Sequence, residues 1–188
     1  MASFYVALVH HPIVDRAGEV VTTAVTNLDV HDIARSCRTY GARAYYVVTP
    51  LTSQREIVQR ILDHWITGPG TRRLPQRGEA LSICTSAESI EAVLRDIEVR
   101  EGQAPKVWVT SARPGPEILS WSDARDELMS DEQPRLILFG TGHGLAPTVM
   151  KEADDRLPPV RAGSYNHLSV RSAVAIILDR LLGDGVES

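Results

Sequence analysis

Short apolar runs alternate with longer amphipathic segments along most of the chain. Runs of five or six residues rich in Val, Ile, Leu and Tyr predict buried strands, because they are too short for helices. Strands separated by helices in this way are typical of an α/β fold with a mostly parallel sheet and helices on both faces. The predicted strands are residues 4–9, 44–48, 80–84, 106–110 and 135–139.

Apolar residues at three- and four-residue spacing predict the helices between these strands. Polar residues that can accept a hydrogen bond from a free backbone N–H stand ahead of most of them, and they are the expected N-caps. Two segments, 15–21 and the Gly-, Pro- and Arg-rich 68–78, are predicted to be loops. The predicted helices are 30–40 after Asp29, 52–65 with Ser53 as cap, 86–95 with Thr85 or Ser86 as cap, 118–129, and 169–182 with Ser169 as cap.

The strand at 135–139 ends in the sequence GTGHG, residues 140–144, where three of five residues are glycine. Glycine admits positive φ angles and lets a ligand approach the backbone closely. A dinucleotide fingerprint needs G-x-G-x-x-G near the first strand, and a P-loop needs Gly-Lys-Ser/Thr, and neither spacing is present here. A phosphate-binding loop is therefore disfavoured, and a plain turn between strand and helix is the alternative to a cofactor loop.

Three segments then point to a known family. They are TNLDVHDIARSCRTYGARAYYVV at 26–48, LILFGTGHGL at 136–145 and YNHLSVRSAVAIILDRLLG at 165–183. In this order they resemble the motifs of the SpoU branch of the SPOUT superfamily, the trefoil-knotted RNA methyltransferases that use S-adenosylmethionine. The HHP sequence at 10–12 resembles the opening of a small group in that superfamily. The resemblance covers nearly the whole chain and implies a C-terminal trefoil knot, a homodimer and a tRNA or rRNA substrate.

In the family that the chain resembles, a bent S-adenosylmethionine is held largely by the backbone of three loops. Gly140 and Gly142 are the strongest candidates, and we expect Gly140→Val to abolish cofactor binding while leaving the fold largely intact. The matching positions, expected to bind the cofactor, are Thr110, Ser111, Ala112, Phe139, Gly140, Thr141, Gly142, Val160, Tyr165, Asn166, Leu168 and Ser169.

The residues expected to serve catalysis are Asn27 and Arg35, which match the family's first motif, and His167. A guanidinium stays protonated, so anchoring a phosphate is a more economical role for Arg35 than acting as a base. Asp29 stands where the SpoU pattern has Gly, and His167 stands where it has Asn, which puts ribose 2′-O methylation in doubt. His167, His143 and Asp29 are instead candidates for a general base that acts on a base nitrogen. A purely structural hydrogen bond is the alternative role of His167.

Length, composition and charge exclude several classes of protein. The 188 residues fit one domain, 1–188, and neither a membrane-spanning run nor a basic leader is expected, so we expect a cytoplasmic protein without membrane contact. Cys37 and Cys84 are too few and too far apart for a disulfide framework or zinc site, and no metal is expected. A net charge of −4 argues against a protein that coats nucleic acid non-specifically, although a local basic patch would suffice for an RNA enzyme.

Arginines supply the expected contacts to RNA phosphates. They are Arg72, Arg73 and Arg77 in the 68–78 segment, for which a solvated loop is the alternative, and Arg35 and Arg38 on the first helix. The sequence thus predicts an RNA methyltransferase that uses S-adenosylmethionine and acts on tRNA or rRNA. Two other classes stay open: an RNA-binding module that binds the cofactor without turnover, and a nucleotide-binding oxidoreductase that uses GTGHG.

Overall fold

A computed structural model describes residues 1–113, 118–160 and 165–183 of the chain. Its main sheet has six strands in the order β5-β4-β1-β7-β6-β8, and every neighbouring pair is parallel. This confirms the predicted α/β fold with a mostly parallel sheet. The strands are β1 (Phe4–Val9), β4 (Ala44–Val48), β5 (Cys84–Ala87), β6 (Lys106–Val109), β7 (Arg135–Gly140) and β8 (Asp155–Arg156), and a separate hairpin is formed by β2 (Ile13–Val14) and β3 (Val20–Val21).

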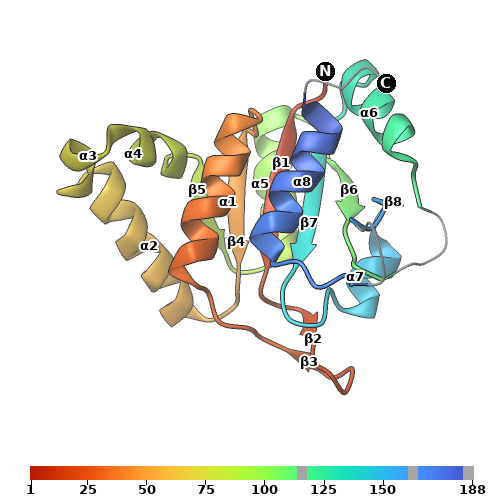
Figure 1. Cartoon of the computed structure of the whole chain (residues 1–188), viewed down its shortest axis with the longest axis horizontal. Coiled ribbons are helices and arrows are strands. Elements are labelled where there is room, and N and C mark those ends of the chain that lie inside the picture. The colour runs from red at the N-terminus through yellow and green to blue at the C-terminus, as the bar shows by residue number, and fades with distance from the viewer. Residues whose placement is uncertain (114–117, 161–164, 184–188) are drawn as a thin grey trace.

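Helices cover both faces of the sheet (Figure 1). On one face lie α1 (Asn27–Thr39), α6 (Trp121–Ser130) and α8 (Val170–Leu182), and on the other lie α5 (Ile90–Glu101) and α7 (Pro147–Glu152). Three further helices extend from the β5 edge beside α1. They are α2 (Thr52–Ile66), α3 (Gly70–Arg73) and α4 (Pro75–Leu81), and they are called the helical extension below.

The core follows the two-residue period of the strands. In β1, Phe4, Val6 and Leu8 pack toward α1 and α8, while the residues between them pack toward α5. Every residue of β1 is buried, because both neighbours of this central strand are strands and both faces are covered. The continuous apolar run at 4–9 is therefore the expected signature of a central parallel strand.

Four of the helices in the described residues, α1, α5, α6 and α8, begin at a capping side chain, and α2, α3, α4 and α7 do not. Ser169 caps α8 as predicted, since its side chain accepts a hydrogen bond from the Ser172 N–H. The prediction of Asp29 as the cap of α1 was wrong: Thr26 accepts from the Asp29 N–H at 3.2 Å, and the helix begins three residues earlier than expected. Ser53 is not a cap either, because it lies inside α2.

The segment 68–95 differs most from expectation. The predicted loop at 68–78 is mostly helical, the predicted strand at 80–84 begins only at Cys84, and the next helix begins at Ile90 with Ser89 as cap. A Cβ on Gly70 would lie 2.6 Å from the ring of Trp65. The glycines here serve close packing of α3 and α4 on α2, which local composition does not reveal.

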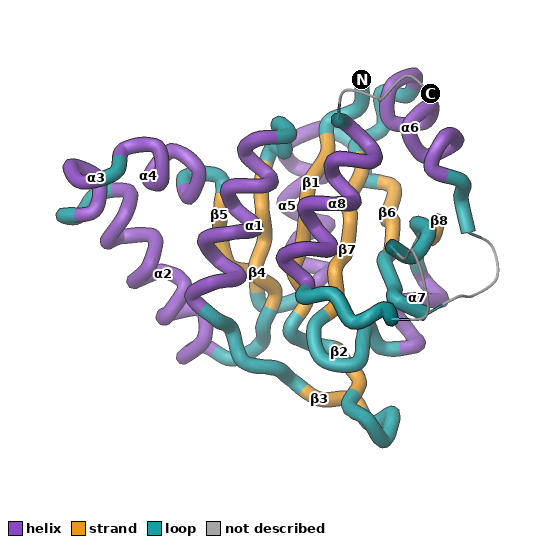
Figure 2. The backbone as a smooth tube through the Cα atoms, viewed as in Figure 1, coloured by secondary structure: helices purple, strands orange, loops and turns teal. Residues whose placement is uncertain are grey.

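The remaining elements lie near their predicted positions. Helix α6 begins at Trp121, three residues later than expected, and the short β2, β3, α7 and β8 were not predicted. Figure 2 shows loops gathered at the carboxyl end of the sheet, where β1 and β7 end and α8 begins. The trefoil knot stays a prediction, because the path from residue 160 to 165 passes outside the described residues. No helix in the described ranges has the length and apolarity needed to cross a bilayer.

Candidate functional site

A cavity of about 480 Å³ lies where β6 and β7 end. Three segments that are far apart in the sequence line it: residues 110–113, residues 139–144, and Val160 with the start of α8 and the chain before it. The carboxyl edge of a parallel sheet is where ligands gather in open α/β folds. The volume suits a small organic ligand, since such pockets span roughly 300–1,000 Å³.

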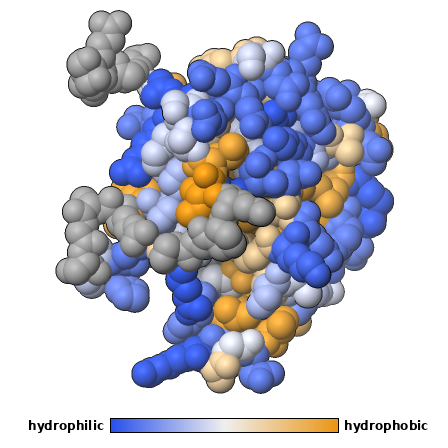
Figure 3. Space-filling view, turned by 90° about the vertical axis from the view of Figure 1, so that its right-hand side faces the viewer, coloured by the Kyte–Doolittle hydropathy of each residue, from blue (hydrophilic) through white to orange (hydrophobic). Residues whose placement is uncertain are grey.

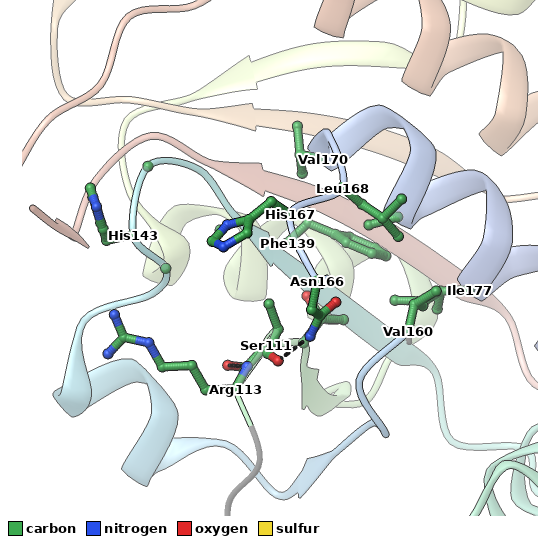
Figure 4. A pocket seen from close by; sticks show the side chains of 16 residues that line it. Ser111, Arg113, Phe139, His143, Val160, Asn166, His167, Leu168, Val170 and Ile177 are labelled. Atoms are coloured by element: carbon green, nitrogen blue, oxygen red, sulfur yellow. Dashed lines mark hydrogen bonds between the residues drawn. The ribbon is translucent and has the colours of Figure 1, made fainter. Parts of the chain in front are cut away.

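The two sides of this cavity differ in polarity (Figure 4). Val160, Leu168 and Ile177 lie on one side, and Phe139 lies next to them. On the other side lie side chains that carry ionisable groups and are solvent-exposed: Arg113, His143 and His167. The cavity can therefore accept a molecule with an apolar ring and polar or charged ends. Seen from the β8 edge, the surface is also mixed, with an apolar area inside a largely hydrophilic face (Figure 3).

Side-chain hydrogen bonds hold the loop after β6 in place. Asn166 Nδ2 donates to the Ala112 carbonyl oxygen at 2.5 Å, and Arg156 Nη2 donates to the Arg113 carbonyl oxygen at 2.6 Å. The Arg113 N–H donates to Ser111 Oγ at 3.0 Å. One wall of the cavity is thus fixed by residues from two later segments. The amide nitrogen of Asn166 already donates to the protein backbone. Asn166 would therefore act on a ligand by holding the 110–113 loop in position.

The glycine loop has its own structural requirements. Gly142 has a φ of 56° and Gly144 a φ of 111°, the left-handed region that favours glycine. A Cβ on Gly140 would lie 2.8 Å from the Leu145 nitrogen, since the chain folds back on itself here. This corrects the expectation for Gly140→Val: the substitution has to move the loop backbone as well as affect binding. Gly144 has open space at its Cβ position.

A partly buried hydrogen-bond chain ties this loop to the end of β1. Thr141 Oγ1 donates to the Val9 carbonyl oxygen at 3.1 Å and also contacts Thr23 Oγ1. The Thr23 hydroxyl therefore donates to Thr141, and its oxygen accepts from His10 Nδ1 at 3.0 Å. Burial lowers the pKa of His10 to about 4, against the opposing effect of the Asp29 charge. His10 is hence neutral at pH 7 and is a support for the loop; it does not line the cavity.

Nine of the twelve predicted cofactor residues line the cavity, and His167 joins them. The other three do not: Thr141 is turned into the hydrogen-bond chain, Ser169 caps α8, and Tyr165 is 77% exposed with its ring against the edge of His167. The nine residues in the lining are Thr110, Ser111, Ala112, Phe139, Gly140, Gly142, Val160, Asn166 and Leu168.

Asn27 and Arg35, both predicted for catalysis, do not line this cavity. Asn27 is exposed at the first position of α1. Arg35 lines a second, open depression of about 610 Å³ between α1 and α8, together with Ser169 and Arg171. Ser169 lines this depression, and its neighbours in the sequence, Leu168 and Val170, line the cavity, so the same segment contributes to both hollows.

Several lining residues were not predicted as cofactor contacts. The helix residues among them were interpreted as part of the buried stripe of α8, and a hydrophobic stripe does not show which of its members face a hollow. Arg113 had no motif to identify it, and His143 was named only as a candidate base. The residues are Arg113, His143, Gly144, Val170, Ala173 and Ile177.

Comparisons with known proteins agree with this architecture. A family model described as SAM-dependent RNA methyltransferase matches residues 3–183. A tRNA (guanine-N(1)-)-methyltransferase of Oleidesulfovibrio alaskensis is 45% identical over 98% of this chain and 43% of its own length. An uncharacterized protein of Aquifex aeolicus is 41% identical over 94% of this chain and 87% of its own length.

The SpoU methyltransferase AviRb of Streptomyces viridochromogenes has a similar crystal structure, with a TM-score of 0.57 and 19% identity over 96% of this chain and 58% of that one. At this identity the likeness concerns the fold alone. The chain spans less than half the length of the curated relatives named as tRNA methyltransferases. Together the findings confirm the family resemblance, the fold class and S-adenosylmethionine as the family's cofactor.

Proposed function

The chain belongs to the family of SAM-dependent RNA methyltransferases, and we propose that it transfers a methyl group from S-adenosylmethionine to RNA, with the donor held in the cavity where β6 and β7 end. The observation that carries the proposal is the convergence of three distant segments, all expected from sequence to hold the cofactor, around one hollow with an apolar side and an ionisable side.

The residues present fit this cofactor. Phe139 and Ile177 are almost fully buried and offer an apolar seat for a ring, and the glycine loop offers backbone without side chains in the way. When bound, S-adenosylmethionine supplies an activated methyl group. The chain's own residues are then needed to orient the acceptor and to take up its proton.

His167 is the proposed general base. It lines the cavity, it is exposed to an incoming substrate, and an imidazole nitrogen is a common proton acceptor in catalysis. His143 lies on the same side and is the alternative. Asp29 is the weakest of the three candidates, because it lies outside the cavity lining and accepts a hydrogen bond from Thr26 Oγ1 at 2.6 Å.

The finer points of the substrate and assembly rest on the relatives and on the resemblance. Two relatives named as tRNA methyltransferases support tRNA as the RNA class. Arg35, Arg38, Arg72 and Arg73, with Arg77, are the proposed contacts to RNA phosphates, and Asn27 is proposed to lie near the target nucleotide. A single domain over 1–188, a homodimer, a trefoil knot and a cytoplasmic location are likewise proposals.

Two measurements test the proposal. Calorimetry with S-adenosylmethionine is expected to show one site per chain, and the protein is expected to transfer labelled methyl groups to total RNA from a strain that lacks it. Cofactor binding without incorporation favours the RNA-binding module. Binding of a nicotinamide dinucleotide in place of S-adenosylmethionine contradicts the proposal and favours the oxidoreductase.

A further inference from the structure

Charge is distributed unevenly along this chain. Residues 27–81, which contain α1 and the helical extension, hold eight arginines and five acidic residues, for a net charge of +3. The rest of the chain holds 12 basic and 19 acidic residues, for a net charge of −7. A polyanion approaching the molecule is therefore drawn to the side formed by α1 to α4.

Trp65, near the end of α2, organises the basic side chains on that side. The Arg77 guanidinium of α4 lies over its ring at 4.7 Å from the ring centre. The imidazoles of His31, from α1, and His64 meet the indole edge-on, with ring centres 5.5 and 5.1 Å away. Three helices thus place three basic side chains around one indole, which restricts their motion before any ligand arrives.

Within the described part of the chain, these groups have no acidic partner of the kind that neutralises other basic side chains. Arg38 pairs with Glu79 at 2.8 Å, and Arg171 lies within 4 Å of Asp29 and Asp32. Among the described residues, neither Arg77 nor His64 has a carboxylate oxygen within that range.

His31 shows the effect of this surplus of positive charge. Its pKa is lowered, first by burial and next by Arg77, with further lowering by Arg35 and His64, while Asp32 opposes them. Its Nδ1 is buried without a hydrogen-bond partner in the described part of the chain. An anion bound beside the ring would relieve the first condition, because its negative charge would favour the imidazolium.

We propose that His31, His64 and Arg77 form a seat for one phosphate of the RNA, outside the cofactor cavity. The inference rests on the proposed function, since the polyanion is the RNA substrate. Arginine and protonated histidine both donate charge-assisted hydrogen bonds to phosphate oxygens. Arg35, one turn after His31 on α1, lines the depression between α1 and α8 together with Ser169, whose neighbours Leu168 and Val170 line the cavity.

The first test compares Arg77→Gln with Arg95→Gln, which removes an exposed arginine from α5 on the opposite face of the sheet. Filter binding of unfractionated tRNA is measured at several salt concentrations. Arg77→Gln is expected to weaken binding about threefold to tenfold and to lower the slope of log affinity against log salt by about 0.7–0.9, as for the loss of one phosphate contact. Arg95→Gln is expected to match the unsubstituted protein, and equal slopes for both variants would overturn the seat.

The second test needs no variant, so it stands even if Arg77→Gln fails to fold. The imidazole C–H signals of His31 and His64 are followed by NMR against pH, alone, with unfractionated tRNA, and with inorganic phosphate at the same phosphate concentration. A higher pKa of His31 with tRNA, and a smaller rise with inorganic phosphate, supports an RNA seat. An equal rise with both overturns the assignment to RNA, and no rise overturns the seat. If tRNA moves His31 but no methyl group is transferred, the proposed function fails and the seat stands.

Discussion

The cavity where β6 and β7 end and the helical extension both depend on glycine, but for different reasons. At the cavity, Gly142 and Gly144 supply positive φ angles in a loop held by backbone and threonine hydrogen bonds. In the extension, Gly70 has an ordinary helical role, and it is glycine because Trp65 leaves no room for a side chain. Gly142 and Gly144 are required by backbone conformation, whereas Gly70 is required by packing on one large side chain. Substitutions in the two regions should therefore affect different properties, which are cofactor binding and tRNA binding.

The largest effect is expected from Trp65→Ala. Loss of a large aromatic side chain that four helices share should cost about 3 kcal/mol of unfolding free energy and weaken binding of tRNA, while the affinity for S-adenosylmethionine stays within about twofold. Trp121→Ala is the matched control, because Trp121 also carries a stacked guanidinium, that of Arg180, but lies on α6. If both variants lose tRNA affinity equally, the extension has no special role in RNA binding.

His10 is expected to make the free energy of unfolding depend on pH, by up to about the same amount as the Trp65→Ala substitution. Its pKa in the folded chain is about 4, against an ordinary value of 6.5, so between these values the unfolded chain binds more protons than the folded one. Stability contributed by the neutral imidazole is therefore complete above pH 6.5 and is lost as the pH falls toward 4, by at most about 3 kcal/mol. Urea unfolding at several pH values measures it, and His10→Asn should flatten the profile. An equally steep profile in that variant would assign the effect to other groups.

Next in size is Gly140→Val. The added side chain meets the Leu145 nitrogen, so we expect a cost of about 1–3 kcal/mol in stability and loss of measurable S-adenosylmethionine binding, with binding of tRNA retained. Gly144→Ala is the comparison, since its Cβ meets open space and only the positive φ is strained. Calorimetry and thermal unfolding measure both quantities, and full cofactor affinity in Gly140→Val would remove this loop from the cofactor site.

The smallest effect is expected from Asn166→Ala. The substitution leaves the Ala112 carbonyl oxygen without its side-chain donor, which should cost about 1 kcal/mol and weaken cofactor binding about fivefold by loosening the wall after β6. Gln59→Ala removes a comparable amide hydrogen bond, to Asp63 on the far side of the molecule in α2, and should leave cofactor affinity unchanged. Unchanged affinity in Asn166→Ala would show that the loop keeps its shape without this contact.

The fold was largely predictable where the apolar period is strong. The run at 135–139 and the stripe of α8 after Ser169 fall where expected, because a buried strand and an amphipathic helix each impose a regular spacing. Prediction failed between 68 and 95. There Pro75 begins a helix, a position that suits proline, and the glycines pack on Trp65, so local composition suggested a loop.

The candidate site was predictable in its segments but not in its individual members. Motif order identified the loops that contain Ser111, Gly140 and Asn166, and all three line the cavity. Thr141 stands between two lining residues yet turns away, and Ile177 faces the hollow from the buried side of α8. The first choice depends on side-chain directions in a loop with positive φ angles, and the second on how α8 packs against the sheet, and no sequence period encodes either.

The amino-acid sequence by itself determined the alternation of strands and helices, the central position of the fully apolar first strand, and the family motifs in their order. Tertiary structure alone decided which members of the segments near residues 110, 140 and 166 face the cavity and that Arg77 and His31 meet at Trp65. The physical reason is that spacing of apolar residues records local burial, whereas parallel pairing and helix packing bring together residues whose separation along the chain carries no signal of contact.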